Sequence, residues 1–343
     1  MQRKYTIAVD AMGGDAAPGM VIEGLHKSAA FINKNGVAIR LYGDEAQINP
    51  LLQKFPAVAA MSEVVHTSEK VMPDDKPSNV IRRGRTTSMW LAIESVRNGQ
   101  ADAVVSAGNT GCLLGISKLV ISMLPGVKRP AITTCVPSKK NKRTVLLDLG
   151  ANSECNEVNI FQFLIMGSLY AKIICGQARP KAAILNIGSE AGKGLDYLTR
   201  ASDMVSANKE NLDFDYAGFA EGDDIFKGEV DVIATDGFSG NVALKTLEGA
   251  AKFITSSLKS AIKSSWIARL GAAIMLPQLL KFRNKFDPRK YNGAVFLGLN
   301  GIVVKSHGGT DAVGFANAVQ YAAALVSADF NSSVRDKMEK IKL

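Results

Sequence analysis

The sequence is poor in the residues that mark disulfide frameworks and metal centres. Its 343 residues include four cysteines (Cys112, Cys135, Cys155 and Cys175), and no two of them form a C-x-x-C pair. Cysteines without disulfide or zinc spacing are typical of small buried residues in a reducing compartment. Histidine occurs only three times, and no group of ligand-type residues has a metal-binding spacing. We therefore expect no metal and no disulfide.

Long apolar runs that would target or anchor the chain are also missing. No apolar signal core precedes the first strand pattern, which predicts a cytoplasmic protein. The uncharged run at residues 270–280 is about half as long as a bilayer-spanning helix requires. The composition is 47% hydrophobic with a mean hydropathy of +0.07, as in ordinary globular chains. With no repeat and no clear linker, we expect one domain over residues 1–343.

Positive charge is concentrated in one segment. The net charge is +9, and residues 258–290 alone carry a net +7, with Asp287 as their single acid. The basic residues there are Lys259, Lys263, Arg269, Lys281, Arg283, Lys285, Arg289 and Lys290. A nucleic-acid-binding protein would show a basic folded face with groove-reading or aromatic elements, so we expect no nucleic-acid partner.

The same segment has a helical pattern of apolar residues. Ile262, Trp266, Leu270 and Ile274 recur at four-residue spacing, which predicts one stripe along a helix. Pro277 is expected to break that helix, and Leu279 to belong to a second short one. The sequence therefore predicts a basic, amphipathic helical hairpin over residues 258–290.

Strand and helix patterns alternate along the rest of the chain. Strand-like runs are at residues 6–10, 39–42, 64–67, 103–106, 132–136, 145–149, 182–187, 216–219 and 230–234. Helical patterns are at residues 18–34, 88–98, 111–123 and 158–175. Because the strand runs are continuously apolar, each strand should be covered on both faces. This predicts an α/β fold with a doubly wound, mostly parallel sheet. Residues 69–87 are expected to form a long functional loop.

Four glycine-rich turns follow strand patterns. They read AMGGDAAP (11–18), SAGNTG (106–111), DGFSGN (236–241) and SHGGTD (306–311). In an open parallel sheet such turns all lie at the carboxyl edge and aim free backbone N–H groups at one crevice. One such turn can merely satisfy a tight corner, but four favour an anionic ligand.

Nucleotide motifs do not explain these turns. The first turn lacks the G-x-G-x-x-G dinucleotide fingerprint. The segment GSEAGKG (188–194) has three residues between its first glycines, where a Walker loop has four, and it ends in glycine where a Walker loop has Ser or Thr. GFSG (237–240) also misses the G-x-S-x-G nucleophile elbow.

Several side chains near these turns are candidates for chemistry. Arg82 and Arg85 could bind phosphate through charge-assisted hydrogen bonds, or could simply form a solvated loop face. His307 lies inside the SHGG turn and is a candidate acid–base residue, whereas His26 and His66 are more typical of structural positions. Lys193 and Lys245 are further candidate cations, alongside the acids Asp10, Asp15, Asp148 and Asp236. Asp148 is best interpreted as a turn cap.

Taken together, the motifs resemble the bacterial phosphate acyltransferase family. The resemblance runs in order from residue 7 to about residue 326 and rests on DAMGGD (10–15), KPSNVIRRGRTTSM (76–89), ADAVVSAGNTG (101–111), RPA (129–131), LDLGAN (147–152), ILNIGSE (184–190), GKG (192–194), DVIATDGFSGNVALKTLEG (231–249) and YNGAVFLGLNGIVVKSHG (291–308). It implies a fold similar to phosphotransacetylases and isocitrate-type dehydrogenases, usually homodimeric. It also implies transfer of a fatty acyl group from acyl carrier protein to inorganic phosphate without a cofactor. The product, acyl phosphate, would supply a membrane glycerol-3-phosphate acyltransferase in phospholipid synthesis.

The resemblance assigns roles to the candidate residues. Asn109 and Asn241 are expected to stabilise the oxyanion with Thr110, and His307 or Lys193 to assist the departing thiolate. Residues expected to bind phosphate and the thioester are Asp10, Gly13, Gly14, Asp15, Arg82, Arg85, Ser106, Gly108, Thr110, Gly111, Asp236, Gly237, Ser239 and Gly240.

The basic hairpin has three expected uses, which can coexist. It could form a dimer interface, dock the acidic carrier protein, or lie at an anionic membrane surface on the cytoplasmic side. The residues expected to serve these contacts are Trp266, Leu270, Ile274, Leu279, Lys281 and Arg283.

Two other functions are weighed against acyl transfer. A dehydrogenase of the related fold would bind nicotinamide, against which the missing fingerprint and missing metal carboxylates argue. A non-catalytic scaffold for membranes or carrier proteins would not need four glycine turns.

Overall fold

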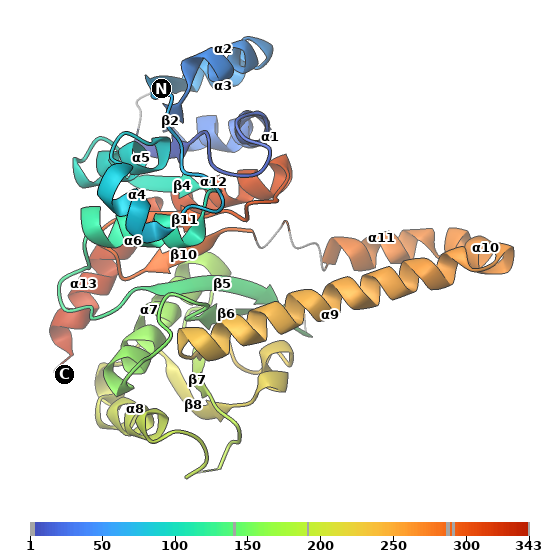
Figure 1. The fold of residues 1–343 in the computed structure, drawn as a ribbon. Coiled ribbons are helices and arrows are strands. Elements are labelled where there is room, and N and C mark those ends of the chain that lie inside the picture. Colours follow the sequence, from blue (N-terminus) through green and yellow to red (C-terminus); the bar gives the residue numbers. More distant parts are fainter. Residues whose placement is uncertain (1–3, 140–141, 191, 286–288, 290–291, 342–343) are drawn as a thin grey trace.

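One sheet of eleven strands organises the chain (Figure 1). The computed structural model describes residues 4–139, 142–190, 192–285, 289 and 292–341. In sheet order the strands are β3 (Ser62–His66), β2 (Val37–Gly43), β1 (Tyr5–Asp10), β4 (Ala103–Ser106), β11 (Ile302–Lys305), β10 (Ala294–Leu297), β5 (Ala131–Pro137), β6 (Arg143–Leu147), β9 (Val232–Ala234), β7 (Lys181–Leu185) and β8 (Asp215–Ala220).

The sheet consists of two parallel blocks that run in opposite directions. β3, β2, β1, β4 and β11 are mutually parallel, and so are β6, β9, β7 and β8. Between the blocks, β10 is antiparallel to β11 and β5, and β5 is antiparallel to β6. The predicted mostly parallel sheet is confirmed. The prediction of one common carboxyl edge is wrong, because reversing the strand direction between the blocks puts their carboxyl ends at opposite edges.

Helices cover both faces of the sheet, as the apolar strand runs predict. The helices are α1 (Gly19–Asn35), α2 (Glu45–Lys54), α3 (Pro56–Met61), α4 (Pro77–Arg83), α5 (Ser88–Arg97), α6 (Thr110–Val120), α7 (Glu157–Cys175), α8 (Asp196–Ala207), α9 (Gly237–Lys263), α10 (Trp266–Ile274), α11 (Leu276–Lys285), α12 (Ala312–Ser327) and α13 (Phe330–Lys340). Ala103 and Val105 of β4 belong to the core shared with α1, α7 and α12, whereas Val104 belongs to the core shared with α5 and α6. Alternate side chains of one strand therefore fill two separate cores.

The apolar helix α7 lies in the first of these cores. By length and hydropathy it is the one described helix that could cross a membrane. Its large side chains Phe161, Phe163 and Tyr170 are nevertheless almost fully buried in the protein. The apolarity of α7 is thus explained by packing on the sheet, where burial of each large side chain contributes about 1.5–3 kcal/mol.

The segment expected to be a long loop contains a helix. Pro77 is in the first turn of α4, where its missing N–H is no loss. Gly84 ends α4, and Thr87 then caps α5 by accepting a hydrogen bond from the Trp90 N–H. The expectation of a long loop over 69–87 is therefore wrong in its middle, where residues 77–83 form a helix that the glycine- and charge-rich composition did not indicate.

A helical arm, α9 to α11, projects away from the sheet (Figure 1). α9 leaves the body as one helix of 27 residues. Ser265 caps α10, and Pro277 lies in the first turn of α11. The predicted single stripe is wrong at one end, because Ile262 belongs to α9 while Trp266, Leu270 and Ile274 lie on α10.

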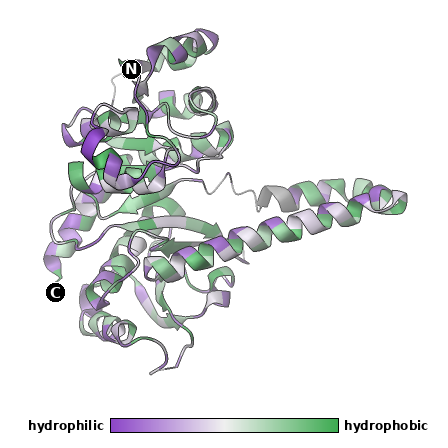
Figure 2. Cartoon of the chain, in the orientation of Figure 1, coloured by the Kyte–Doolittle hydropathy of each residue, from purple (hydrophilic) through white to green (hydrophobic). Residues whose placement is uncertain are grey.

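Apolar residues are spread along the arm (Figure 2). Trp266 and Ile274 are 73% and 74% exposed, Leu270 is 56% exposed, and Lys281 is exposed too. Leu279 is half-buried. Residues 286–288 and 290 of the predicted hairpin, and the side chain of Arg283, lie outside the described residues. An arm with this much exposed apolar surface is typical of an interaction site.

Candidate functional site: two glycine-lined ends of the sheet

The carboxyl end of β1 is built around Asp10. Its side chain is buried and accepts hydrogen bonds from Ser106 Oγ at 2.7 Å and Ser88 Oγ at 2.7 Å. The Met12 N–H donates to the same carboxylate at 3.3 Å. Burial raises the pKa of Asp10, against the lowering effect of these hydrogen bonds. Asp10 therefore ties the turn after β1 to the turn after β4 and to the start of α5.

Glycines let these turns approach one another closely. A Cβ on Gly13 would lie 2.5 Å from Asp10 Oδ2 and 2.7 Å from the Gly108 nitrogen. Gly14 has a φ of +107°, a conformation that other residues rarely adopt. The next residue, Asp15, donates its N–H to the Gly308 carbonyl at 3.0 Å. The sequence-predicted turns at 11–18, 106–111 and 306–311 thus meet at one end of the sheet.

The turn after β11 is fixed by Asn292. Its Nδ2 donates to Ser306 Oγ at 2.8 Å, and its Oδ1 accepts from the His307 N–H at 3.0 Å. His307 is exposed, and its Nδ1 accepts from the Gly309 N–H at 3.1 Å. A neutral His307 therefore carries its proton on Nε2, directed away from its own turn.

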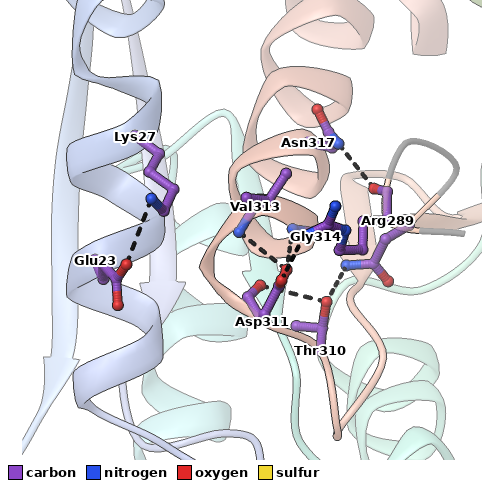
Figure 3. Close-up of polar contacts among 9 residues, drawn as sticks. Glu23, Lys27, Arg289, Thr310, Asp311, Val313, Gly314 and Asn317 are labelled. Atoms are coloured by element: carbon purple, nitrogen blue, oxygen red, sulfur yellow. Dashed lines mark hydrogen bonds and ion pairs between the residues drawn. The ribbon is translucent and has the colours of Figure 1, made fainter. Parts of the chain in front are cut away.

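The start of α12 completes this turn (Figure 3). Asp311 caps the helix by accepting from the Val313 and Gly314 N–H groups at 3.1 and 3.0 Å. Its other oxygen accepts from Arg289 Nη1 at 2.9 Å, and Asn317 donates to the Arg289 carbonyl at 2.8 Å. The ion pair Glu23–Lys27 on α1, also drawn in Figure 3, is an exposed surface contact.

Asn109 is a structural anchor in this arrangement. Its Oδ1 caps α6 by accepting from the Cys112 N–H at 3.0 Å. Its Nδ2 donates to the carbonyls of Pro73 and Asp75 at 2.8 and 3.2 Å. Both amide N–H groups of Asn109 therefore have backbone acceptors in this structure, and its expected part in stabilising an oxyanion stays a prediction. Thr110 and Gly111 are the first residues of α6, so their N–H groups have no partner within the helix.

The candidate arginines lie beside α6. Arg82 lies in the last turn of α4 and is exposed, and α4 packs on α6. Arg85 is also exposed, and its guanidinium carbon lies 6.0 Å from the centre of the Trp90 ring. Both exposed cations precede Ser88, whose hydroxyl donates to Asp10, and their guanidinium groups are suited to contact an anion.

Sequence reasoning missed Lys305 at the same end. This last residue of β11 is only 8% exposed, and its Nζ donates to the Ala107 carbonyl at 3.4 Å and to the Ser306 carbonyl. Burial lowers the pKa of Lys305 to about 8, although Asp10 and Asp15 act in the opposite direction. The one signal in the sequence is a lysine that ends the apolar run 302–304 directly before the SHGG turn.

A second cluster surrounds Asp148, at the opposite edge of the sheet. The buried Asp148 carboxylate accepts from the backbone N–H groups of Ile132, Gly150, Ala151 and Asn152 at 2.8–3.1 Å and from Asn152 Nδ2 at 2.8 Å. Burial raises its pKa in spite of these hydrogen bonds. The prediction of Asp148 as a turn cap agrees with this geometry.

The DGFSGN turn packs on that cluster. Asp236 caps α9 by accepting from the Ser239 N–H at 2.8 Å, and it also accepts from Ser239 Oγ and from the Tyr197 hydroxyl. A Cβ on Gly237 would lie 2.8 Å from Asp148 Oδ2, and Gly240 also packs directly on the Asp148 backbone. Glycine is required here for close packing of α9 against the turn after β6.

Lys193 and Asn241 lie at this second edge. Lys193 follows β7 and forms an exposed ion pair with Glu190 at 2.8 Å, while its carbonyl accepts from Asn186 Nδ2. Asn241 is exposed in the first turns of α9, next to Gly150. Lys245, one turn further along α9, pairs with Glu248 at 2.9 Å.

The predicted site residues thus divide into two groups. His307 and the turns after β1, β4 and β11 form one end, which we call the Asp10 end. Lys193, Asn241 and the turn after β9 form the other, which we call the Asp148 end. The prediction that all four turns face one crevice is wrong within a single chain, for the strand-direction reason given above. Among the described residues, no group of three or more His, Cys, Asp or Glu side chains is arranged to hold a metal ion.

Comparisons with known proteins place the chain in a family. A family model described as "Fatty acid synthesis protein" matches residues 5–333. The phosphate acyltransferase of Rhodospirillum rubrum is 48% identical over 343 residues, covering 100% of this chain and 97% of the relative. That of Paramagnetospirillum magneticum is 46% identical over 342 residues, covering 100% and 96%. The chain belongs to the phosphate acyltransferase family. It is accordingly an acyltransferase, and the dehydrogenase alternative is not favoured.

Solved structures agree on the fold of this family member. A phosphotransacetylase from Streptococcus pyogenes superposes with a TM-score of 0.64 at 18% identity, covering 95% of this chain and 94% of that one. A branched-chain phosphotransacylase from Enterococcus faecalis gives a TM-score of 0.57 at 14% identity, covering 94% and 100%. At these identities the likeness shows the fold alone, and it is the fold that the sequence resemblance implies.

Proposed function

We propose that this acyltransferase moves a fatty acyl group from the thioester of acyl carrier protein to inorganic phosphate, giving acyl phosphate for phospholipid synthesis. The observation that carries the proposal is the Asp10 end of the sheet. Three glycine turns meet there, α6 begins in the second of them, and Arg82 and Arg85 lie shortly before Ser88, which contacts Asp10. Backbone N–H groups at a helix start and nearby guanidinium groups are suited to bind phosphate.

The chemistry needs little from the protein beyond positioning. Phosphate is already a nucleophile at neutral pH, and its oxygen attacks the thioester carbonyl carbon. A C–O bond forms, the C–S bond breaks, and the departing thiolate takes a proton. Holding both substrates in register and stabilising the oxyanion with fixed N–H groups supply most of the catalysis in such a reaction. Neither a metal nor an organic cofactor enters this sequence of steps.

His307 is the proton donor we propose for the departing thiolate. His307 is exposed and its Nδ1 accepts from the Gly309 N–H, so Nε2 is the ring nitrogen left to donate a proton. An imidazole N–H in this position can donate a proton to a thiolate. The Thr110 and Gly111 N–H groups at the start of α6 are the oxyanion donors on the same side.

Lys193 and Asn241 enter the same reaction only from a second copy of the chain. They lie at the Asp148 end, across the sheet from His307 in one chain. α9 begins at that end with exposed apolar residues, Phe238 at 68% and Val242 at 51% exposure, and continues into the arm with Phe253 at 72%. An apolar row of this kind is suited to a two-fold interface. We therefore propose a homodimer that brings the Asp148 end of one chain to the Asp10 end of the other.

The outer part of the arm is proposed to contact the carrier protein and the membrane. Its basic residues complement an acidic carrier protein and anionic lipid headgroups. Trp266, Leu270 and Ile274 present exposed apolar side chains on α10. Such a helix is suited to lie in the lipid interface. This supports a cytoplasmic enzyme held at the inner face of the cell membrane, where it would supply a glycerol-3-phosphate acyltransferase.

The test is phosphate-dependent release of free thiol from acyl carrier protein loaded with a long acyl chain. The full-length chain should release thiol and form acyl phosphate in equal amounts, with a rate that saturates in phosphate. Arsenate, which has the same charge and geometry, should support thiol release without a stable acyl product. Thiol release at the same rate without either anion would show a simple thioesterase, and no release at all would leave a scaffold role.

A further inference from the structure

Lys305 is an exception among the basic residues of this chain. Among the described residues it is the only lysine or arginine that is buried. Its ammonium group lies between two backbone carbonyls, that of Ala107 in the turn after β4 and that of Ser306 in the turn after β11. The same two turns are joined by the Ser306 N–H, which donates to the Ser106 carbonyl at 2.9 Å. Lys305 therefore contacts two turns of the Asp10 end from the interior of the protein.

The two carbonyls matter for an anion site. A seat for phosphate must present N–H groups and keep carbonyl oxygens turned away, because their partial negative charge repels the ligand. Glycine turns expose both kinds of group. Because the Ala107 and Ser306 carbonyls both accept from one buried ammonium, they are engaged inside the protein and are not free to face an anion.

The charged neighbours of Lys305 come from several elements. Asp10 at the end of β1 and Asp15 in the following turn attract its ammonium group. His307 follows two residues later in the chain, and Arg289 is paired with Asp311 at the start of α12. β4 and β10, the strands on either side of β11, contribute no titratable side chain, and α12 contributes only Tyr321. An incoming phosphate would therefore add negative charge to a place where one buried cation faces two acids.

We propose that Lys305 is a positioning residue for phosphate: its ammonium group holds the turns after β4 and β11 in the conformation that accepts the anion, and offsets the anion's charge from beneath. This inference rests on the proposed function and deepens it. It differs from the roles proposed for the exposed Arg82 and Arg85, because Lys305 is buried and acts through the backbone of two turns.

The effect of Lys305 on the stability of the fold distinguishes a functional role from a role in packing. Because burial lowers the pKa of Lys305 to about 8 from 10.5, the folded chain gives up this proton before the unfolded chain does. Stability from this group should thus increase as pH rises from about 8 to 10.5, and the charged form is a burden on the fold at neutral pH. An apolar side chain of similar length should therefore be tolerated, and the melting temperature of Lys305→Met at pH 7 should equal or exceed that of the wild type.

The experiment compares Lys305→Met and Lys305→Arg with Lys118→Met, a control at an exposed lysine on α6. We expect Lys305→Met to raise the KM for phosphate by about tenfold or more, with a change of less than about twofold in the KM for the acyl donor. In the wild type, kcat/KM for phosphate should fall as pH rises above about 8. This fall in kcat/KM at high pH should be absent in Lys305→Met. In Lys305→Arg it should move to higher pH, because a guanidinium group stays protonated.

A second measurement does not depend on turnover. Inorganic phosphate should raise the melting temperature of the wild type and of Lys118→Met, and this rise should be mostly lost in Lys305→Met. An unchanged phosphate KM together with an unchanged fall in kcat/KM at high pH in Lys305→Met would overturn the inference. If the wild type releases no thiol with phosphate, the proposed reaction fails instead. The phosphate-induced rise in melting temperature then decides on Lys305 alone: its loss in Lys305→Met supports the inference, and its persistence there overturns it.

Discussion

Ser106 Oγ donates to Asp10 Oδ2 at 2.7 Å, and this bond joins the ends of two neighbouring strands inside a fully buried network. Ser106 Oγ also accepts from the Gly108 N–H at 3.0 Å. One hydroxyl thus connects the buried acid of the first glycine turn with the backbone of the second. The shape of the Asp10 end depends on this connection as much as on the glycines.

Replacement of Ser106 by Ala should therefore destabilise the fold. It removes one donor to the buried Asp10 carboxylate and the side-chain acceptor of the Gly108 N–H, at a cost of about 1–3 kcal/mol in the free energy of unfolding. Urea unfolding followed by circular dichroism measures this. Ser260→Ala on the exposed surface of α9 is the matched control and should change the free energy by less than about 0.5 kcal/mol. Equal values for the two variants would contradict the network described here.

Asp148 should be more sensitive still. Replacement by Ala removes the acceptor of five hydrogen bonds and leaves buried backbone N–H groups unpaired. We expect a loss of about 3 kcal/mol or more in the free energy of unfolding. Asp196→Ala, at an exposed position in the first turn of α8, serves as the control for removing a carboxylate. A loss below about 1 kcal/mol for Asp148→Ala would show that the turn is stable without the Asp148 carboxylate.

The strands and the glycine turns could be predicted because their signals are local. An apolar run marks a buried strand, and glycines such as Gly36, at a φ of +67°, end the adjacent helix wherever the strand is placed. The direction of a strand within the sheet is not local. The reversal passes through β10 and β5, each of which is antiparallel to the strand that follows it in the chain. These two strands also pair with each other although they are distant in sequence, so nothing near Asp236 indicates that its turn lies opposite Asp10.

The helix α4 and the buried position of Lys305 could not be predicted from the sequence, for physical reasons. α4 has a proline, a serine and an asparagine in its first turn and two arginines at its end, so only its packing on α6 makes it a helix. Lys305 ends an apolar strand, and a lysine there is normally exposed. Its burial follows from the meeting of three turns in space, which no single stretch of the sequence records.

Arg82 and Arg85 should be needed for phosphate more than for the acyl donor. Replacing either by Ala removes an exposed cation beside the Asp10 end, so we expect the KM for phosphate to rise about tenfold while the KM for the acyl donor changes little. Steady-state kinetics with each substrate varied separately measures the two effects. Arg97→Ala, which removes an exposed arginine from the far end of α5, should leave both constants unchanged. Unchanged phosphate kinetics in both Arg82→Ala and Arg85→Ala would remove these residues from the site.

Variants at the two ends of the sheet should complement each other. His307→Ala and Lys193→Ala are each expected to be nearly inactive, because each affects every site of a homodimer built from identical chains. When the two variants are coexpressed and purified as a mixed dimer by two different tags, one site in each dimer combines the intact His307 with the intact Lys193. Part of the activity should therefore return. No recovery in a verified mixed dimer would show that the two ends do not act in one site.

Membrane binding should depend on the apolar residues of the arm as well as on its charge. Replacing Leu270, Ile274 and Leu279 by Ser should abolish flotation with vesicles of anionic phospholipid, because charge attraction alone gives weak binding that salt screens. The wild type should float with anionic vesicles and less with zwitterionic ones. Leu119→Ser, at an apolar residue that is 55% exposed on α6, is the control for loss of surface apolarity and should float like the wild type. Flotation that persists in the triple variant would show that the arm attaches by charge alone, and normal thiol release by that variant would show that its site is intact.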